Sequence, residues 1–268
     1  MGPEASPLTK ARIADLRGLR DKRRRLETGR FLVEGFHVLE EALRAGAPVE
    51  EVYLGEGAAR APAGLRVAEA ARAAKAKVVE IPKRLLDRLC DSETPQGVLA
   101  VLRAPDAAAP LPLDRDGICV VLDGIQDPGN AGAILRAADA FGCASVVFCR
   151  GTVEALNPKV IRAAQGSHFH LPVATGPEAA AVAAAARKAG HLVRAAVARD
   201  GVSLYDTPAA GRRTTLVFGN ETRGPAPETL DACDARITIP LRGRAESLGV
   251  AAAAAVVLAW HARSGTAP

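Results

Sequence analysis

The loop Asp123–Asn130 carries the first residues of this chain that could do chemistry. It follows the apolar run Ile118–Leu122, which predicts a strand buried on both faces. A helix is predicted next over Ala131–Phe141, with Asn130 as its cap. Arg136 falls on the side of this helix that points away from the packed stripe. A strand, a Gly/Asn loop, a helix start and a free arginine together suit a ligand and an anionic substrate.

Two later segments repeat this arrangement. Leu216–Gly224 (LVFGNETRG) is a buried strand that runs into a Gly-Asn-Glu turn, and Ile237–Val250 (ITIPLRGRAESLGV) is a strand, a Pro/Gly loop and a helix start at Ser247. Ligands of open α/β sheets bind at the carboxyl ends of strands, so three such loops would build one pocket lined by backbone. Many Gly-rich turns bind nothing. The chain also lacks the dinucleotide G-x-G-x-x-G pattern and a P-loop lysine, which argues against another nucleotide cofactor.

Positive charge is concentrated in the first thirty residues. They hold nine Lys or Arg and four Asp or Glu residues, so this arm carries the whole net charge of +5. A basic arm on an otherwise balanced protein favours phosphate binding, and we expect Arg23, Arg24 and Arg25 to contact RNA. The stretch also fits a solvated helix, and both interpretations can hold together. The residues that would face inward in that helix are Ile13, Leu16, Leu19 and Leu26.

Length and composition place the chain among globular proteins. Its 268 residues are enough for two domains, with 49% hydrophobic and 24% charged residues. No apolar run approaches a membrane span, and Met1–Arg12 has no apolar signal core, so we expect a cytoplasmic protein. The five cysteines have no C-x-x-C spacing, which predicts reduced, mostly buried thiols and no metal site.

Residues 1–104 alternate helices with short apolar strands, which predicts a small α/β sandwich behind the basic arm. The predicted helices are Glu34–Ala45, Leu65–Lys77 and Pro82–Cys90, and the predicted strands are Val49–Leu54, Val78–Ile81 and Val98–Leu102. Residues 105–115 are rich in Pro and Ala without periodicity and are predicted to be an interdomain linker.

Residues 116–268 show a β-α-β alternation that predicts a parallel sheet wrapped by helices. After the opening strand and helix, the predicted strands are Ser145–Phe148, Phe169–Val173, Leu192–Val197, Thr214–Phe218 and Arg236–Ile239. The predicted helices are Asn157–Gly166, Glu178–Gly190 and Ser247–Arg263.

Three motifs occur in order, each at the end of a predicted strand. They are Pro128–Arg136 (PGNAGAILR), Gly219–Gly224 as G-x-E-x-x-G, and Ile239–Gly243 (IPLRG) followed by Ser247–Val250 (SLGV). The motifs resemble those of the SpoU (TrmH-type) class of RNA ribose 2′-O-methyltransferases in the SPOUT superfamily. Through FLVEGFHVLEEAL and ETPQGVLAV, the N-terminal part also looks like the family's substrate-binding domain, whose fold is similar to ribosomal protein L30e.

The resemblance implies an α/β fold: a C-terminal SPOUT methyltransferase domain with a parallel sheet and a deep trefoil knot, plus a small L30e-like domain. It implies S-adenosylmethionine as the cofactor, bent among the three loops and held largely by backbone. The residues that it places at the cofactor are Phe218, Gly219, Asn220, Ile239, Leu241 and Leu248. It also implies a homodimer with the active site at the subunit interface, and 2′-O-methylation of ribose in RNA, with 23S-type ribosomal RNA favoured over transfer RNA.

The catalytic residues that the resemblance implies are Asn130, Arg136, Glu221 and Ser247. Because a guanidinium stays protonated in nearly all proteins, we assign Arg136 to holding a phosphate and stabilising the developing alkoxide. Glu221 would orient Arg136, and Asn130 would hydrogen-bond the ribose or shape the loop; a water-exposed turn residue is the alternative for Glu221. Arg162 is a candidate phosphate contact from the partner subunit.

The chain departs from the family pattern in the cofactor loops. Gly249 stands where Asn is usual, and Pro225 where Leu is usual. We expect Gly249 to weaken activity by on the order of 1 kcal/mol, unless a positive φ requires glycine there. Gly249 is also the main argument for the alternative function, a non-catalytic RNA-binding or ribosome-assembly factor on the same fold.

Overall fold

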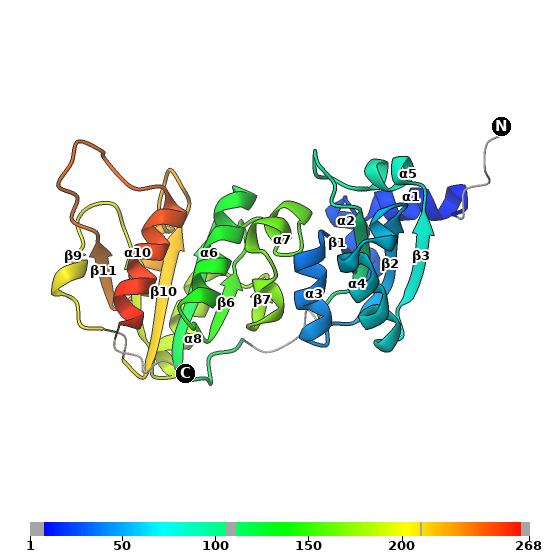
Figure 1. Cartoon of the computed structure of the whole chain (residues 1–268). Helices are drawn as coiled ribbons and strands as arrows, with labels where there is room; N and C mark the ends of the chain where they lie inside the picture. The colour runs from blue at the N-terminus through cyan, green and yellow to red at the C-terminus, as the bar shows by residue number, and fades with distance from the viewer. Residues whose placement is uncertain (1–7, 106–110, 210, 264–268) are drawn as a thin grey trace, which may run out of the picture. The chain divides into compact units, whose positions relative to one another are not determined.

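The computed structural model describes residues 8–105, 111–209 and 211–263, which form two compact units (Figure 1). The first unit contains the chain through Asp106 together with Leu156–Phe169, and the second contains Ala107–Ala155 and the chain from His170 onward. The predicted division at residues 104 and 116 stays a prediction, and residues 106–110 of the predicted linker lie outside the described residues.

A four-stranded sheet in the order β1-β4-β2-β3 forms the centre of the first unit. β4 is antiparallel to β1 and β2, whereas β2 and β3 are parallel. The strands are β1 (Arg30–Glu34), β2 (Val49–Gly55), β3 (Lys77–Ile81) and β4 (Val98–Arg103). The helices are α1 (Lys10–Gly18), α2 (Lys22–Thr28), α3 (Phe36–Arg44), η1 (Ala58–Arg60), α4 (Pro62–Ala73), α5 (Lys83–Leu89), α7 (Pro158–Ala164) and η2 (Ser167–Phe169).

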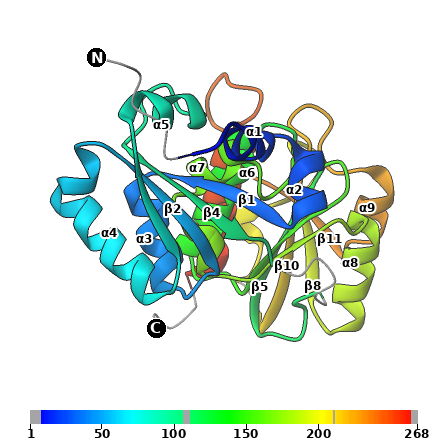
Figure 2. The same ribbon diagram turned by 90° about the vertical axis from the view of Figure 1, so that its right-hand side faces the viewer.

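Alternation along β1 divides the core of this unit into two layers. Phe31 and Val33 pack with residues of α3 and α4, which lie side by side (Figure 2), while Leu32 packs with residues of α1 and α5. Helices on both faces of a mixed sheet confirm the predicted small α/β domain. The sequence pattern did not predict β1, because its apolar residues span only three positions beside the basic arm.

The predicted inward face of the basic arm is correct at Leu16 and Leu19 and wrong at Leu26, whose side chain is 69% exposed. The arm is not one helix. α1 ends at Gly18, and α2 begins after Asp21, whose carboxylate accepts a hydrogen bond from the Arg23 N–H at 2.7 Å. This break takes Leu26 out of register with the apolar stripe of α1.

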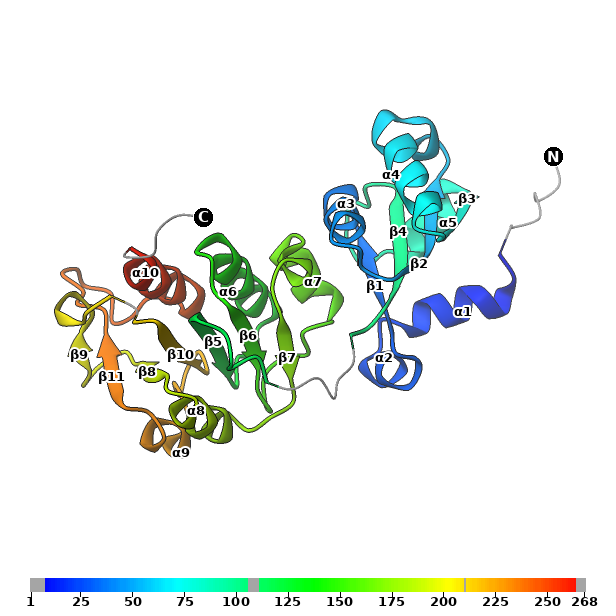
Figure 3. The ribbon, with the colours of Figure 1, turned by 90° about the horizontal axis from the view of Figure 1, so that it is seen from below.

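A seven-stranded, wholly parallel sheet in the order β7-β6-β5-β10-β8-β11-β9 forms the second unit. The strands are β5 (Gly117–Asp123), β6 (Ser145–Phe148), β7 (Val173–Thr175), β8 (Leu192–Ala196), β9 (Val202–Ser203), β10 (Arg213–Gly219) and β11 (Ala235–Thr238). The helices are α6 (Pro128–Ala140), α8 (Ala179–Lys188), η3 (Leu204–Asp206), α9 (Pro227–Asp231) and α10 (Val250–Ala262). α6 and α10 cover one face of the sheet and α8 and α9 the other (Figure 3), which confirms the predicted architecture.

Some predicted elements differ from the structure. The predicted strand Phe169–Val173 is wrong, because Ser167–Phe169 forms a 3₁₀ turn and pairing with β6 begins only at Val173. The helix predicted from Ser247 begins at Val250. Among the described residues, no helix combines the length and the apolar character needed to cross a bilayer.

The order of strands brings the later motifs beside the first. β10 lies between β5 and β8, and β11 lies on the far side of β8, although all three follow β5 in sequence. The parallel direction places the carboxyl ends of β5, β10 and β11 at one edge of the sheet. This order is consistent with the trefoil knot, which stays a prediction.

A buried pair holds the end of α10 against β8. Arg194 and His261 are both buried, and Arg194 Nη1 lies 2.8 Å from His261 Nε2. Nδ1 of His261 lies 2.8 Å from the carbonyl oxygen of Val257. A carbonyl can only accept, so Nδ1 carries the proton and Nε2 accepts from Arg194, which makes His261 neutral. Burial, with help from the neighbouring arginines, lowers the pKa of His261.

We expect this pair to make the stability of the protein pH-dependent. Because the folded-state pKa of His261 is depressed, its stabilising effect is complete above the unfolded pKa of about 6.5 and is lost as the pH falls towards the folded pKa. The loss is at most about 1.4 kcal/mol per pH unit. Thermal unfolding between about pH 7.5 and 5.5 should therefore show a shallower pH dependence in His261→Gln than in the wild type. Equal slopes would contradict the neutral assignment.

Candidate functional site

The first loop of the site leads from β5 directly into α6. Asp127 is the N-cap of α6, and its carboxylate accepts from the Asn130 N–H at 2.8 Å; Pro128 occupies the first turn. The prediction that Asn130 caps a helix starting at Ala131 is therefore wrong by one turn. With its backbone N–H bound to Asp127, Asn130 lies inside the helix, and its side chain is free to reach the second loop.

The second loop begins where β10 ends, with Gly219 beside Asp123 in the β5–β10 register. Asn220 shapes the turn: its side-chain oxygen accepts from the N–H groups of Thr222 (3.1 Å) and Arg223 (3.2 Å). The Asn220 amide also donates to the carbonyl oxygen of Gly124 at 2.9 Å. The side chain predicted to bind cofactor is therefore committed to joining the two loops.

Gly219 is required by close packing of this turn. A Cβ added there would lie 1.9 Å from the nitrogen and 2.4 Å from the Cα of Pro225, distances that no real contact allows. Pro225 is buried, so the proline that departs from the family pattern is the residue that closes the turn on Gly219.

Glu221 joins the first and second loops. Its carboxylate accepts from the N–H groups of Gln126 (3.3 Å) and Asp127 (3.1 Å) and from the side-chain amide of Asn130 (3.2 Å). Glu221 is exposed, as the turn-residue alternative expected. Slight burial of the carboxylate raises its pKa, but hydrogen bonds from its own backbone and from Asn130, Asp127 and Gln126 lower it more, so the pKa lies below its usual value. An ionised Glu221 therefore fixes the Asn130 amide.

Thr152 is a positioning residue that the sequence pattern did not reveal. Its hydroxyl donates to the carbonyl oxygen of Leu122 at 2.8 Å and accepts from the N–H of Gly124 at 3.0 Å. It thus clamps the point where β5 becomes the first loop. A threonine after a strand is too common in sequences to signal this role.

The third loop, residues 239–249, is built differently. Residues 241–249 are all exposed, and residues 239–248 form no hydrogen bond with any other residue that the structure describes. Ile239 is half-buried, and Leu241 and Leu248 are 39% and 38% exposed. Ser247, predicted to be catalytic, lies exposed in this loop without a recorded partner in the described chain. The apolar side chains of this loop suit contact with an adenine ring, and its free backbone groups suit hydrogen bonds to an amino-acid moiety.

Gly249 is the N-cap of α10, with φ −56°, and a Cβ there would meet nothing within 4 Å. The negative φ means that the local backbone does not require glycine. The weaker activity expected from Gly249, and the non-catalytic alternative that rests on it, stay predictions. We expect Gly249→Asn to stabilise the protein by only a few tenths of a kcal/mol, since Gly and Asn are both acceptable N-caps. The loss of about 1 kcal/mol predicted from the sequence concerns activity rather than folding stability, and it stays a prediction. Thermal unfolding and cofactor titration of Gly249→Asn would measure the two effects, and a large loss in either would contradict this view.

Arg136 lies exposed on α6 and has no hydrogen bond or ion pair to any residue in the described ranges. The expected contact with Glu221 is absent from the described chain, because Glu221 is occupied by Asn130 and the first-loop backbone. Phe218 is 1% exposed within β10, so only its backbone could reach a ligand.

The arginines predicted to bind RNA have different surroundings. Arg25 is buried and donates to the carbonyl oxygens of Leu19 (2.9 Å) and Arg20 (2.7 Å), so its assignment to RNA is wrong. Arg23 pairs with Glu27 at 2.8 Å, and Arg24 with Asp15 at 2.7 Å. Arg162 lies 3.6 Å from Asp91 within the first unit.

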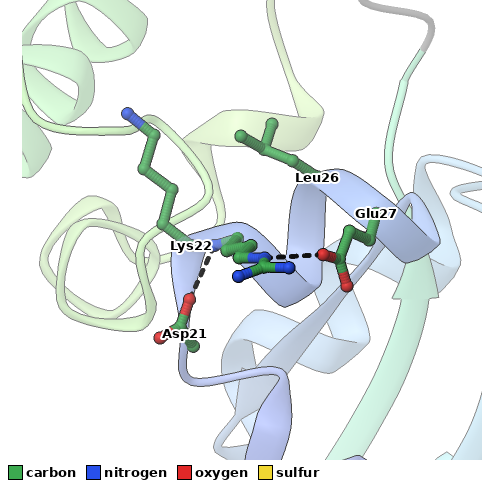
Figure 4. Close-up of a pocket in the computed structure, with 5 residues that line it drawn as sticks. Asp21, Lys22, Leu26 and Glu27 are labelled. Atoms are coloured by element: carbon green, nitrogen blue, oxygen red, sulfur yellow. Dashed lines mark hydrogen bonds and ion pairs between the residues drawn. The ribbon is translucent and has the colours of Figure 1, made fainter.

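A hollow beside α2 is lined by Asp21, Lys22, Arg23, Leu26 and Glu27 (Figure 4). The dashed contacts in the figure are local to α2: Arg23 bonds to Asp21 through its backbone and to Glu27 through its side chain. Charged groups that satisfy one another on a seven-residue helix give no reason to assign a ligand. Within the described residues, no group of three or more His, Cys, Asp or Glu side chains could hold a metal ion.

Comparisons with known proteins agree with this geometry. Residues 117–259 match the SpoU rRNA Methylase family, and residues 10–100 match the MRM3-like substrate binding domain. The 23S rRNA (guanosine(2553)-2′-O)-methyltransferase RlmP of Bacillus subtilis is 33% identical over 252 residues, covering 94% of this chain and 96% of that protein. The 23S rRNA (uridine(2479)-2′-O)-methyltransferase of Streptomyces viridochromogenes is 32% identical, and the match covers 91% of this chain and 85% of that protein.

A solved structure of similar fold contains the expected cofactor. The SpoU methyltransferase AviRb of Streptomyces viridochromogenes, in complex with AdoMet, superposes with a TM-score of 0.85 at 27% identity, covering 96% of this chain and 100% of that one. The family match spans the three loops, and the relatives span nearly the full chain. This chain belongs to the SpoU rRNA methylase family.

Proposed function

We propose that this protein transfers a methyl group from S-adenosylmethionine to the 2′-hydroxyl of a ribose in ribosomal RNA. The main observation behind this proposal is the contact between Glu221 and Asn130, which joins two motifs 91 positions apart in sequence into one site. The names of the relatives, which act on 23S rRNA, favour ribosomal RNA over transfer RNA.

The cofactor would be held mainly by backbone. Gly219, Ile239 and Leu248 would supply main-chain groups, because the third loop leaves its own free and the turn at Gly219 is closed by Pro225. The exposed side chains of Leu241 and Leu248 would cover the adenine. When bound, S-adenosylmethionine supplies an electrophilic methyl group on a sulfonium.

Positioning supplies much of the rate enhancement in such an in-line displacement. Carboxylate oxygens only accept hydrogen bonds, so the NH₂ group of Asn130 must face Glu221, which leaves Asn130 Oδ1 free to orient the ribose 2′-hydroxyl. Arg136, which pairs with no described residue, would bind the adjacent phosphate and stabilise the oxygen as it loses its proton. Ser247 would act from the third loop, closing over the bound substrates.

The direct test is methyl incorporation. The protein would be incubated with methyl-labelled S-adenosylmethionine and ribosomal RNA from a strain lacking its gene, with transfer RNA from the same strain in parallel. We expect labelling of ribosomal RNA at one 2′-O position. Cofactor binding without transfer to either RNA would instead support the non-catalytic alternative.

We further propose that the protein is a homodimer through its second unit. α10 buries Ala254, Val257 and Leu258 in its own unit, but its other face is also apolar and leaves Val256 40% exposed. A second copy would cover this face. Sedimentation at micromolar concentration should give twice the chain mass, and Val256→Arg should shift it towards the monomer. A monomeric wild type would contradict the proposal.

A further inference from the structure

The described part of the chain carries two groups of basic side chains. In the basic arm, Arg23 and Arg24 are paired with carboxylates and Arg25 is buried against carbonyl oxygens. The side chains of Lys10, Arg17 and Lys22 are exposed and have no partner among the described residues. Arg242 and Arg244 in the third loop are also exposed, and no described residue pairs with their side chains. The same holds for the side chain of Arg223 in the second loop.

Three carboxylates at this edge of the sheet are bound to loop backbone, whereas Glu246 in the third loop is exposed and pairs with no described residue. The Asp123 carboxylate accepts a hydrogen bond from the N–H of Ala226 at 2.8 Å, and the Asp127 carboxylate accepts one from the N–H of Asn130. The Glu221 carboxylate accepts from N–H groups of the first loop. These carboxylates bind loop backbone, whereas the guanidinium groups face water. The edge therefore presents donors for an anion even though its formal charges nearly balance.

The position of the third loop determines which anion these arginines would meet. The loop leaves β11 at the same carboxyl edge of the sheet as Asn130 and Glu221, so RNA bound along that edge would come within reach of its side chains. The cofactor would contact the backbone and the leucines of this loop. Arg242 and Arg244 would then remain available to the RNA. Guanidinium groups bind phosphate oxygens with two parallel hydrogen bonds, a geometry that lysine cannot provide.

We propose that Arg242 and Arg244 bind phosphates of the RNA strand next to the methylated nucleotide, so that RNA and cofactor order the third loop together. This inference rests on the proposed function and names a part of the RNA site. It adds a phosphate contact in a loop of the catalytic unit to the contact that the charge count predicts for the basic arm.

The test compares RNA binding of the full-length wild type and Arg242→Gln/Arg244→Gln over a range of salt concentrations. Each phosphate contact to a single strand contributes about 0.7 to the slope of log K against log salt, so the double variant should lose about 1.4 of that slope. Its affinity for RNA should fall at least about tenfold at moderate salt. Its KM for RNA should rise by more than its kcat falls, and its affinity for S-adenosylmethionine should stay within about twofold.

A matched control removes the same charge at the opposite edge of the sheet. Arg115 precedes β5 and Lys188 ends α8 just before β8, both are exposed, and neither side chain has a partner among the described residues. Arg115→Gln/Lys188→Gln should leave the salt slope unchanged.

Each outcome bears on the proposal separately from the enzymatic activity. If both double variants changed the slope equally, the effect would come from net charge alone, and the inference would be overturned. An unchanged slope in Arg242→Gln/Arg244→Gln would also overturn it. A loss of cofactor affinity without a change in slope would also overturn it. If the wild type binds RNA with the expected slope difference but transfers no methyl group, the proposed function fails while the phosphate contact stands.

Discussion

Arg136→Ala is expected to abolish measurable methyl transfer while leaving the affinity for S-adenosylmethionine within a few-fold of wild type. Arg136 is exposed on α6 and has no partner in the described chain, so its removal should disturb neither the helix nor the three loops. In the proposed mechanism Arg136 contacts the RNA, where its positive charge lies beside the ribose 2′-oxygen that becomes negative. Removing one such preorganised donor typically costs 10²–10³ in kcat, and about that loss is the minimum expected here.

Single-turnover methylation with saturating cofactor measures this effect, and thermal unfolding provides the control for folding. Arg136→Lys retains the charge but loses the planar fork, so it should recover only part of the activity. Turnover at the wild-type level in Arg136→Ala would show that the arginine is not part of the chemistry. A lowered unfolding midpoint would instead reveal a structural role that its exposure does not suggest.

Gly219→Ala is expected to destroy the second loop and with it cofactor binding. The added Cβ would lie 1.9 Å from Pro225 N and 2.1 Å from the carbonyl carbon of Gly224, and both are backbone atoms that cannot rotate away. The turn must therefore open, which would break the contacts of Asn220 with Gly124 and of Glu221 with Asn130. We expect affinity for S-adenosylmethionine to fall at least about 100-fold and stability to fall by roughly 1–3 kcal/mol.

Gly211 provides the matched control, because it precedes the same strand at the opposite edge of the sheet. A Cβ at Gly211 would meet no atom within 4 Å, so Gly211→Ala should behave as wild type in cofactor titration and unfolding. If Gly219→Ala bound cofactor normally, the turn would have to be soft enough to accept the methyl group, and the close approach of Pro225 would have no functional meaning.

The sequence alone determined the outline of the catalytic unit. Runs such as Ile118–Leu122 and Thr214–Phe218 are apolar throughout, which is possible only for strands covered on both faces, and each is followed by a Gly-bearing turn and a helix start. Because parallel strands end at one edge, the common location of the three loops followed from local patterns. Helix starts were less accurate: Asp127 caps α6 where Asn130 was expected, and α10 begins at Val250 rather than at Ser247.

The partners of the site residues were decided only by the tertiary structure. Glu221 was assigned to Arg136 but binds Asn130, because β10 lies beside β5 and brings the second loop over the start of α6. Thr152 clamps the first loop from a segment with no motif. A carboxylate or hydroxyl bonds to whatever donor the packed strands place within about 3 Å, and chain spacing does not encode that distance.

The same limit applies to the surroundings of the charged side chains. Counting residues correctly located the excess of arginines in the arm, yet burial and pairing depend on neighbours from other elements: Arg25 turns inward onto the carbonyls that end α1, and Arg24 meets Asp15 across the break between α1 and α2. In the third loop, the absence of such neighbours among the described residues leaves Arg242 and Arg244 free. Sequence determines how many charges a segment carries, whereas tertiary packing decides which of them remain available to a ligand.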